Sequence, residues 1–296
     1  MFQFPSGSES PITVLAGHWT NPKARTGCTV ILFDRPASAV ADVRGGAPGT
    51  RETDLLAPGQ LVGSIDAILL TGGSAFGLNA AGGVMTFLRD HQRGVTTSAG
   101  PVPIVPAAVI FDLSVGEPSW PSPENAITAC RDAVPLRELE RGQVGAGAGA
   151  TIRKMFPGVT SVRGGVGIGH VDLDVDSSIT AIAVVNAAGD VLLDSNAPDL
   201  RTGLLQNAAG ITAREATTLL AVILDVPVDQ RVLHRAATAA HSAIARKIRP
   251  SHTIFDGDTV FAAGLRIGAI EPAEVLRYSV AVELAVERAI IDAVTA

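Results

Sequence analysis

Runs of apolar residues along the chain predict a protein built from alternating strands and helices. The run Ala67–Leu70 is uninterrupted and follows Asp66, which is typical of a strand buried on both faces of a sheet. The other strand-like runs are Ile12–Ala16, Cys28–Phe33, Ser38–Asp42, Ala107–Leu113, Gly165–Val171, Thr180–Val185, Val191–Asp194, Leu219–Leu224 and Thr259–Ala263. The pattern therefore predicts an α/β protein with a central sheet.

Four segments are predicted to be helical. Ser74 is expected to cap a helix that runs to about Arg89, and the alanines and glycines in this helix indicate close packing. The other predicted helices are Glu124–Val134, Asp229–Ile248 and Pro272–Ala293. The last helix has a polar strip opposite an apolar face, so we expect most of it to be buried, in the core or in an oligomer interface.

Residues 195–216 interrupt this pattern. They include Asn196, Pro198, Asn207 and Gly210 and show few periodic signals, which predicts the least structured interior segment of the chain. Such a segment is also the best candidate for a linker at which the chain is processed. A boundary within the chain is therefore expected here.

The composition favours a folded core and argues against several classes of protein. Hydrophobic residues make up 47% of the chain and aromatic residues only 4%, so the chain is not disordered and its core must be aliphatic. The net charge is −6, and the only dense basic cluster lies at 246–249, which argues against nucleic acid as a partner. No apolar run reaches the roughly 20 residues of a membrane span, and the start lacks the basic residues of a signal peptide. We therefore expect a cytoplasmic protein with no membrane partner.

The motifs for metals and nucleotides do not fit this chain. Cys28 and Cys130 are far apart, with no histidine nearby at metal-ligand spacing, so they are predicted to be reduced, buried thiols and no metal site is expected. The glycine-rich stretch 145–150 meets only a relaxed form of the dinucleotide fingerprint, and the stretch 163–169 does not end as a P-loop does. We expect no cofactor.

Ser74 also lies in the setting of a nucleophile elbow, because it follows a predicted strand and precedes a predicted helix. The elbow requires glycine two residues after the serine, where this chain has Phe76. We therefore favour the capping role for Ser74 over a role as nucleophile.

Asp256 and Asp258 are separated by one glycine and lead into a predicted strand. On its own, an Asp-Gly pair is usually a turn. Two carboxylates on either side of a residue without a side chain can also converge on one hydroxyl or one ammonium group. The functional interpretation therefore requires a partner elsewhere in the sequence.

Thr217 supplies a possible partner, because it follows Ala216 at the end of the irregular segment and begins an apolar strand. Threonine is common in strands, so β propensity alone can explain it. Alternatively, the chain cleaves itself before Thr217, and the freed α-amino group becomes the base for the hydroxyl of the same residue. The pKa of a free α-amine is about 7.7–8.0, so an appreciable fraction is unprotonated at neutral pH.

Several segments together resemble the DmpA/BapA-type family of self-processing aminopeptidases. This family includes L-aminopeptidase/D-amino-acid esterase-amidases, β-peptidyl aminopeptidases and nylon-oligomer hydrolases. The matching segments are Ala24–Val30, Asp42–Thr50, Leu70–Leu78, Gly145–Thr151, Val185–Ala187 and His252–Phe261. The resemblance spans nearly the whole chain and implies a single domain over residues 1–296. The implied fold is a four-layer α-β-β-α sandwich, shared with the ornithine acetyltransferases.

The resemblance also implies a role for each candidate site residue. Thr217 would be the nucleophile, with Asp256 and Asp258 as its orienting and proton-handling partners. Asn186 would donate a hydrogen bond to the oxyanion of the tetrahedral intermediate. Lys154 matches a lysine placed at the active site in some relatives, whereas Phe111 stands where some relatives offer a tyrosine hydroxyl. Without the family, Asn186 would be interpreted as the start of a turn and Lys154 as a solvated charge.

The implied function is hydrolysis of the amide bond after an N-terminal amino acid in small peptides, amides or esters, through an acyl-enzyme on Thr217. Cleavage between Ala216 and Thr217 would give chains 1–216 and 217–296, and a homo-oligomer is expected. Many relatives have asparagine where this chain has Ala216. Two alternatives remain open, namely acyl transfer as in the ornithine acetyltransferases, and an uncleaved, catalytically silent binding or structural protein.

Overall fold

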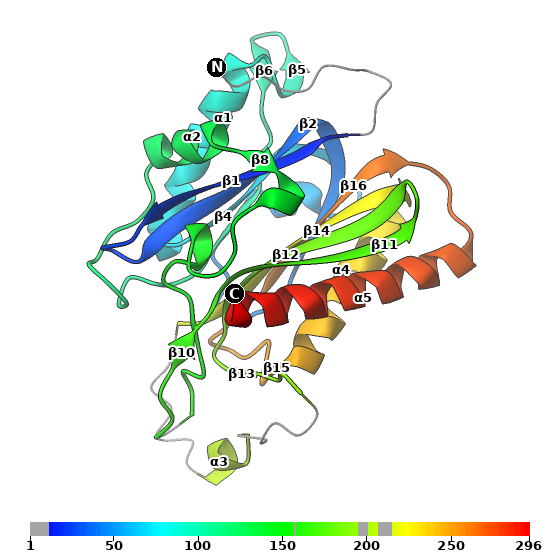
Figure 1. The fold of residues 1–296 in the computed structure, drawn as a ribbon. Helices are drawn as coiled ribbons and strands as arrows, with labels where there is room; N and C mark the ends of the chain where they lie inside the picture. Colours follow the sequence, from blue (N-terminus) through cyan, green and yellow to red (C-terminus); the bar gives the residue numbers. More distant parts are fainter. Residues whose placement is uncertain (1–11, 157, 195–200, 207–214) are drawn as a thin grey trace.

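The computed structural model describes residues 12–156, 158–194, 201–206 and 215–296 (Figure 1). The α-helices in this part of the chain are α1 (Ala81–Asp90), α2 (Pro123–Arg131), α3 (Arg201–Gln206), α4 (Gln230–Lys247) and α5 (Pro272–Thr295). The short 3-10 turns are η1 (Asp54–Leu56), η2 (Ser74–Ala80), η3 (Leu136–Glu138) and η4 (Gly145–Gly147).

A ten-stranded sheet forms the centre of the molecule. In spatial order, its strands are β11 (Gly165–Asp174), β12 (Ser177–Asn186), β14 (Thr217–Val228), β16 (Thr259–Ile267), β2 (Thr26–Val43), β4 (Ser64–Thr71), β7 (Ala107–Val109) and β3 (Thr50–Arg51). In addition, β1 (Val14–Asn21) pairs with β2, and β8 (Val134–Pro135) pairs with β1. The small two-stranded pairs are β9 (Thr151–Ile152) with β10 (Val162–Arg163), β13 (Asp190–Val191) with β15 (Ile248–Arg249), and β5 (Val95–Thr97) with β6 (Gly100–Val102).

Strand β2 joins two halves of this sheet. Its first part pairs with β1 and β4, and its last part, from Ser38, pairs with β16. The pairing with β4 shifts register between Leu32 and Ala37. A bulge of this kind bends a strand and carries it from one half of the sheet to the other. The two strands predicted at Cys28–Phe33 and Ser38–Asp42 are therefore one continuous strand.

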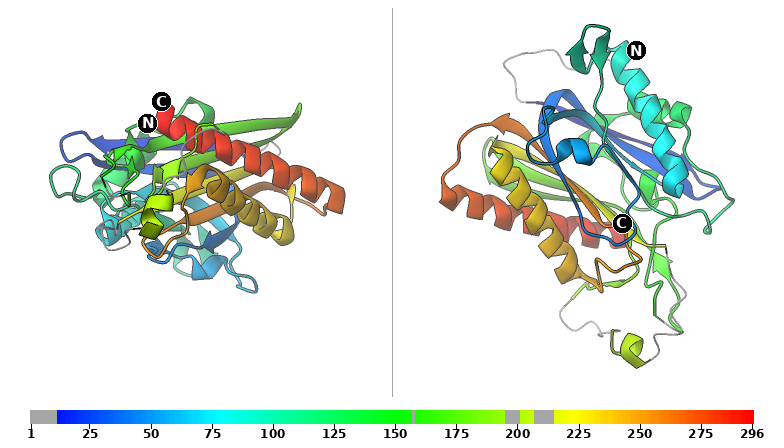
Figure 2. Two further views of the ribbon diagram at one scale, coloured as in Figure 1. Left: turned by 90° about the horizontal axis from the view of Figure 1, so that it is seen from below. Right: turned by 180° about the vertical axis from the view of Figure 1, so that it is seen from behind.

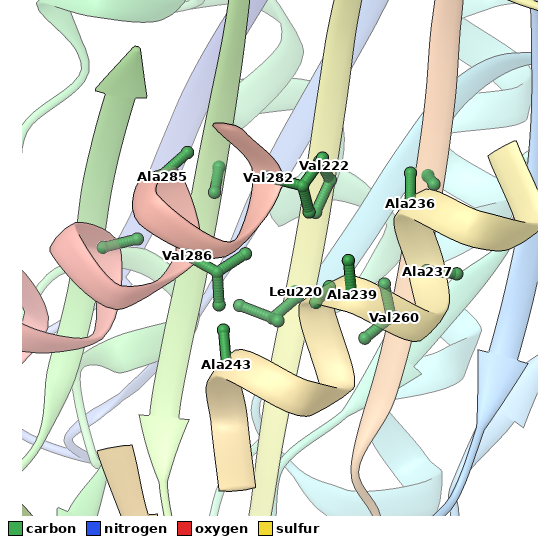
Figure 3. Close-up of a cluster of buried hydrophobic side chains, with 14 of the residues drawn as sticks. Leu220, Val222, Ala236, Ala237, Ala239, Ala243, Val260, Val282, Ala285 and Val286 are labelled. Carbon is green, nitrogen blue, oxygen red and sulfur yellow. The ribbon is translucent and has the colours of Figure 1, made fainter. Parts of the chain in front are cut away.

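Three apolar cores divide the molecule into four layers. The first core lies between the helices α1 and α2 and their strands and includes Leu69, and the second lies between the two halves of the sheet and includes Phe33 and Phe261. The third core includes Val222 and Val286, where α4 and α5 cover the other face (Figure 3). Figure 2 shows α4 and α5 side by side against the strands. The predicted α-β-β-α sandwich with an aliphatic core is confirmed.

Alternate glycines on β11 allow α5 to approach the sheet closely. A Cβ atom at Gly167 would lie 2.1 Å from the Ala289 carbonyl oxygen, and one at Gly169 would lie 1.9 Å from the Ala285 carbonyl oxygen. Any side chain at these positions would push the helix away. The glycine-rich stretch at 163–169 is therefore a surface for helix packing.

Ser74 does not cap a helix, so that prediction is wrong. The residue at the N-cap of η2 is Gly73, with φ of +81°, and no side chain makes a capping hydrogen bond there. Ser74 itself has φ of +53°, and its N–H donates to the Ile110 carbonyl oxygen at 2.9 Å. This bond ties the turn to the chain that follows β7, and the α-helix begins only at Ala81.

Other predicted elements are shorter than expected. The helix α2 stops at Arg131, because Val134 pairs with β1 as part of β8, and the strands β7 and β13 stop at Val109 and Val191. Within the predicted irregular segment 195–216, α3 is a six-residue helix. Residues 195–200 and 207–214 lie outside the described residues.

Cys28 and Cys130 are buried and form no disulfide, as predicted. Burial raises the pKa of both thiols, that of Cys28 to about 12. Along the described chain, no helix combines the length and the apolar character needed to cross a membrane.

Candidate active site

Neighbouring strands bring the predicted site residues to one end of the sheet. The strand β12 ends at Asn186, and its antiparallel pairing with β14 places Asn186 opposite Thr217. The strand β16 runs parallel to β14, and a bridge just before it joins Ala216 to Asp256. Residues from three distant parts of the sequence therefore lie together because of the pairing of these strands.

Thr217 is held against the peptide bond that precedes it and is only 4% exposed. Its hydroxyl donates to the Ala216 carbonyl oxygen, with Oγ1 and the oxygen 2.5 Å apart. The same oxygen accepts the Gly257 N–H at 2.9 Å. A preorganised N–H at a carbonyl oxygen stabilises the negative charge that develops there when the carbon is attacked. The geometry therefore provides one oxyanion donor at the bond before Thr217.

Asp258 is buried and fixes the backbone around the threonine, not its hydroxyl. Its Oδ1 accepts the Thr218 N–H at 2.6 Å, and its Oδ2 accepts the N–H of His252 at 2.9 Å and lies 2.7 Å from His252 Nδ1. Burial lowers the pKa of His252, but the hydrogen bond and charge of Asp258 outweigh it, so this pKa lies above its ordinary value. His252 and Asp258 therefore form a hydrogen-bonded pair beside the start of β14.

Asp256 orders the loop that leads into β16. Its Oδ2 accepts both the N–H of Thr253, at 2.9 Å, and the Thr253 hydroxyl, at 2.5 Å. Its Oδ1 accepts the N–H of Ala188 at 3.4 Å. Burial and the nearby charge of Asp258 raise the pKa of Asp256. The carboxylate makes no hydrogen bond to Thr217, although the loop it holds carries the Gly257 N–H.

Lys154 connects the candidate nucleophile's strand with that of Asn186. Its Nζ donates to the Glu215 carbonyl oxygen at 2.7 Å, and to the Asn186 carbonyl and side-chain oxygens at 3.0 and 2.7 Å. Burial lowers the pKa of Lys154 to about 7, against the opposing charges of Asp256, Glu215 and Asp112. The lysine is therefore part of the site, rather than a solvated loop charge.

The side chain of Asn186 is fully buried. Its Oδ1 accepts from the Thr151 N–H at 2.9 Å as well as from Lys154, and its Nδ2 donates to the Phe111 carbonyl oxygen at 3.1 Å. An amide nitrogen carries two N–H groups. One of them is used by Phe111, and the other has no acceptor among the described residues.

One cavity borders Thr217, and a second cavity adjoins it. A cavity of about 240 Å³ is bordered by Thr217, Ala216 and Ser74. A second cavity, of about 450 Å³, is bordered by Lys154. Phe111 and Glu215 line both, so the cavities share a wall at the candidate nucleophile.

The structure adds residues to which the sequence analysis gave no role. His252 and Thr253 contact the two aspartates, and they lie in a segment that carries the family resemblance. Asp112 is 1% exposed and accepts the Gly73 N–H at 2.7 Å, and burial raises its pKa to about 6. The resemblance pointed to this part of the chain, but only the folded contacts identify these side chains.

The described residues of the candidate site do not form a set of metal ligands. Across the residues for which positions are given, no three histidine, cysteine, aspartate or glutamate side chains converge as a metal ion would require. The Lys154 amine also lies near the acidic side chains of Asp256, Glu215 and Asp112.

Comparisons with known proteins identify the family of this chain. The model of the family described as Peptidase family S58 matches residues 12–296. The chain is 42% identical to an uncharacterized aminopeptidase of Mycobacterium leprae over 269 residues, or 83% of this chain and 72% of that protein. It is 30% identical to a 6-aminohexanoate-oligomer endohydrolase of Agromyces over 284 residues, or 88% of this chain and 73% of that protein.

A solved structure shares the fold. It is the L-aminopeptidase D-Ala-esterase/amidase of Ochrobactrum anthropi, described as a variant of the Ntn hydrolase fold. The TM-score is 0.74 at 17% identity, with 99% of this chain and 88% of that chain covered. The resemblance to the DmpA/BapA-type aminopeptidase family is confirmed by these matches. This chain belongs to peptidase family S58 and is a hydrolase of peptide or amide bonds with an Ntn-type fold.

Proposed function

We propose that the chain cleaves itself between Ala216 and Thr217 and then acts as an N-terminal-nucleophile aminopeptidase. The observation that carries the proposal is the contact of the Thr217 hydroxyl with the Ala216 carbonyl group, whose oxygen also accepts the Gly257 N–H. The proximity of the Thr217 hydroxyl, the Ala216 carbonyl group and the Gly257 N–H supports this proposal.

Self-cleavage would proceed as an N-to-O acyl shift. Thr217 Oγ1 attacks the Ala216 carbonyl carbon, the C–N bond breaks, and the hydroxyl proton goes to the departing amine. Water then hydrolyses the ester, which leaves a carboxylate on Ala216 and a free amine on Thr217. Lys154 supports this step by holding the Glu215 carbonyl oxygen one residue before the bond.

Hydrolysis of a substrate repeats this chemistry with the new α-amine as base. The amine accepts the hydroxyl proton while Oγ1 attacks the substrate carbonyl, and the leaving amine takes up that proton. The second N–H of Asn186 serves as the oxyanion donor of the acyl transfer, together with the Gly257 N–H once Ala216 has left. Water activated by the α-amine then releases the acyl group from Thr217.

The substrates are short peptides, amides or esters with a free N-terminal amino acid. The cavity of about 240 Å³ at Thr217 suits one small residue, and the relative from Mycobacterium leprae is named an aminopeptidase. A homo-oligomeric assembly and a cytoplasmic location belong to the same proposal.

The test is the release of free amino acid from matched substrates. Purified protein is expected to hydrolyse alanyl-p-nitroanilide and to leave N-acetylalanyl-p-nitroanilide intact, because the cavity of about 240 Å³ at Thr217 suits one small residue without an acyl group on its amine. Cleavage of both substrates at equal rates would contradict an aminopeptidase. Transfer of the alanyl group to an added amine in preference to water would favour the acyltransferase alternative.

A glycine substitution tests the self-cleavage geometry. A Cβ atom at Gly257 would lie 2.8 Å from Thr217 Oγ1 and 3.0 Å from the Ala47 carbonyl oxygen. Because this displaces the hydroxyl, we expect Gly257→Ala to slow cleavage about tenfold, measured as the fraction of intact chain by denaturing mass spectrometry. Gly82→Ala is the control, since a Cβ at that position meets nothing within 4 Å. Equal cleavage rates in the two variants would contradict the geometry.

A further inference from the structure

The larger of the two cavities beside Thr217 is lined by basic side chains. It has a volume of about 450 Å³, and its charged lining residues are Arg25, Lys154 and Arg163 with a single acid, Glu215. Among these, Lys154 is already bonded to backbone and side-chain oxygens of the candidate active site. The two arginines are therefore the lining residues available to bind a negatively charged group.

Arg25 has no acidic partner among the residues that the structure describes. Its side chain is half-buried, yet within the described part of the chain it makes neither an ion pair nor a side-chain hydrogen bond. A partly desolvated guanidinium group ordinarily finds a carboxylate or another acceptor, because burial removes some of its water. The cavity therefore presents an arginine that lacks an anion.

The backbone at Arg25 is held in a conformation that seldom carries a long side chain. Its φ is +52°, in the left-handed region that favours glycine or asparagine. The turn before it is fixed by Asn21, whose Oδ1 accepts the N–H groups of Lys23 and Ala24 at 3.1 and 3.0 Å. A strained position on a fixed turn that nevertheless bears arginine points to a role for the side chain.

Arg163 reaches the same cavity from β10, and it too has no ion pair among the residues that the structure places. In the pairing of β9 with β10, Arg163 lies opposite Thr151. The N–H of Thr151 donates to Asn186 Oδ1 at 2.9 Å. The strand that carries Arg163 is thus connected to the candidate oxyanion residue through β9.

We propose that this cavity is a subsite for a carboxylate on the leaving part of the substrate, bound by Arg25 and Arg163. The inference rests on the proposed aminopeptidase function and deepens it by naming the substrate class. The smaller cavity receives the N-terminal residue, and the larger cavity, which shares Phe111 and Glu215 with it, receives the remainder. The planar guanidinium fork matches the two oxygens of a carboxylate, so the preferred substrates are very short peptides with a free C-terminus.

Matched substrates test this subsite directly. Alanylglycine carries the C-terminal carboxylate, alanylglycinamide lacks it, and alanylglutamic acid α-amide carries a carboxylate only on its side chain. We expect Arg25→Gln to raise KM for alanylglycine about tenfold, as loss of hydrogen bonds to a charged group does, with kcat and the kinetics of alanylglycinamide unchanged. Arg163→Gln should act in the same direction but less, because Arg163 is exposed.

The third substrate distinguishes the two sources of a carboxylate. If alanylglutamic acid α-amide also loses affinity in Arg25→Gln, the subsite accepts acidic side chains as well as C-termini. Arg235→Gln is the control, because Arg235 is exposed on α4, lines a different groove and also lacks an ion pair among the described residues. Equal losses for alanylglycine and alanylglycinamide, or no loss for either, would overturn the subsite.

Failure of the subsite can be told apart from failure of the proposed function. If the wild-type protein hydrolyses alanylglycinamide and alanylglycine with the same KM, only the subsite is contradicted. If no substrate is hydrolysed, binding to the uncut Thr217→Ala chain decides, measured by calorimetry or NMR with N-acetylglycine and N-acetylglycinamide. Arg25→Gln should then weaken binding of N-acetylglycine alone, and equal binding of the two ligands to the unaltered pocket would overturn the inference.

Discussion

Thr217→Ala is expected to leave one intact chain of 30.3 kDa with no hydrolytic activity. The alanine has no hydroxyl to attack the Ala216 carbonyl carbon, so neither the acyl shift nor an acyl-enzyme can form. Wild-type protein should instead contain residues 1–216 and 217–296, the second chain beginning with threonine. Denaturing mass spectrometry and N-terminal sequencing measure both outcomes.

The neighbouring threonine provides the matched control. Thr218 is also buried, and its hydroxyl has no hydrogen-bond partner among the described residues. Thr218→Val preserves the shape of the side chain, so cleavage and activity should stay close to those of wild type. Cleavage in Thr217→Ala, or a wild-type protein that is active while fully intact, would rule out the proposed nucleophile.

Asp258→Asn and Asp256→Asn are each expected to lower kcat/KM about 100-fold, because small displacements in a catalytic arrangement carry costs of this size. An asparagine at 258 can still accept the Thr218 N–H through its oxygen. Its NH₂ group, however, cannot accept the two hydrogen bonds from His252. An asparagine at 256 likewise cannot hold both donors of Thr253 on one oxygen and accept from Ala188 on the other.

The pH profile of the residual activity should move to lower pH in both aspartate variants. Activity rises with pH as the α-amine of Thr217 loses its proton, and nearby carboxylates raise the pKa of that ammonium. Removing the charge of Asp256 therefore lowers the pKa of the amine, and it lowers that of Lys154 further, since Asp256 is the first of the charges that raise it. Asp90→Asn, at an exposed position on α1, is the control for net charge. Full activity with an unmoved profile in both variants would reduce the Asp-Gly-Asp segment to a turn.

Local patterns in the sequence predicted individual strands better than the bends and turns that connect them. Unbroken apolar runs identified strands such as β4, because a strand buried on both faces leaves that pattern whatever surrounds it. The continuity of β2 was hidden, since polar residues occupy its bend between Leu32 and Ala37. Ser74 was misjudged because its conformation depends on a hydrogen bond to Ile110, which is distant in the sequence.

The candidate site could be located from the sequence only through family resemblance. Periodicity places Thr217 at the start of a strand. It cannot show that Asn186 lies opposite Thr217, because local hydrophobic patterns do not determine the order of strands in a sheet. The contacts of His252 with Asp258 and of Lys154 with two carbonyl oxygens also depend on packing between distant segments. Spacing alone gave no role to His252 and would interpret Lys154 as a solvated charge.

The position of Thr217 at the start of β14 has a consequence for assembly. β14 lies between β12 and β16, and β16 also pairs with β2, so the strands on either side of the proposed cut remain interleaved after it. The two pieces should therefore stay associated without a covalent link. Refolding of separated pieces would require an encounter between two molecules, at a rate that depends on concentration, whereas the uncut chain folds alone. Self-cleavage would thus make the mature enzyme a heterodimer of residues 1–216 and 217–296 whose two pieces are assembled while they are still one chain.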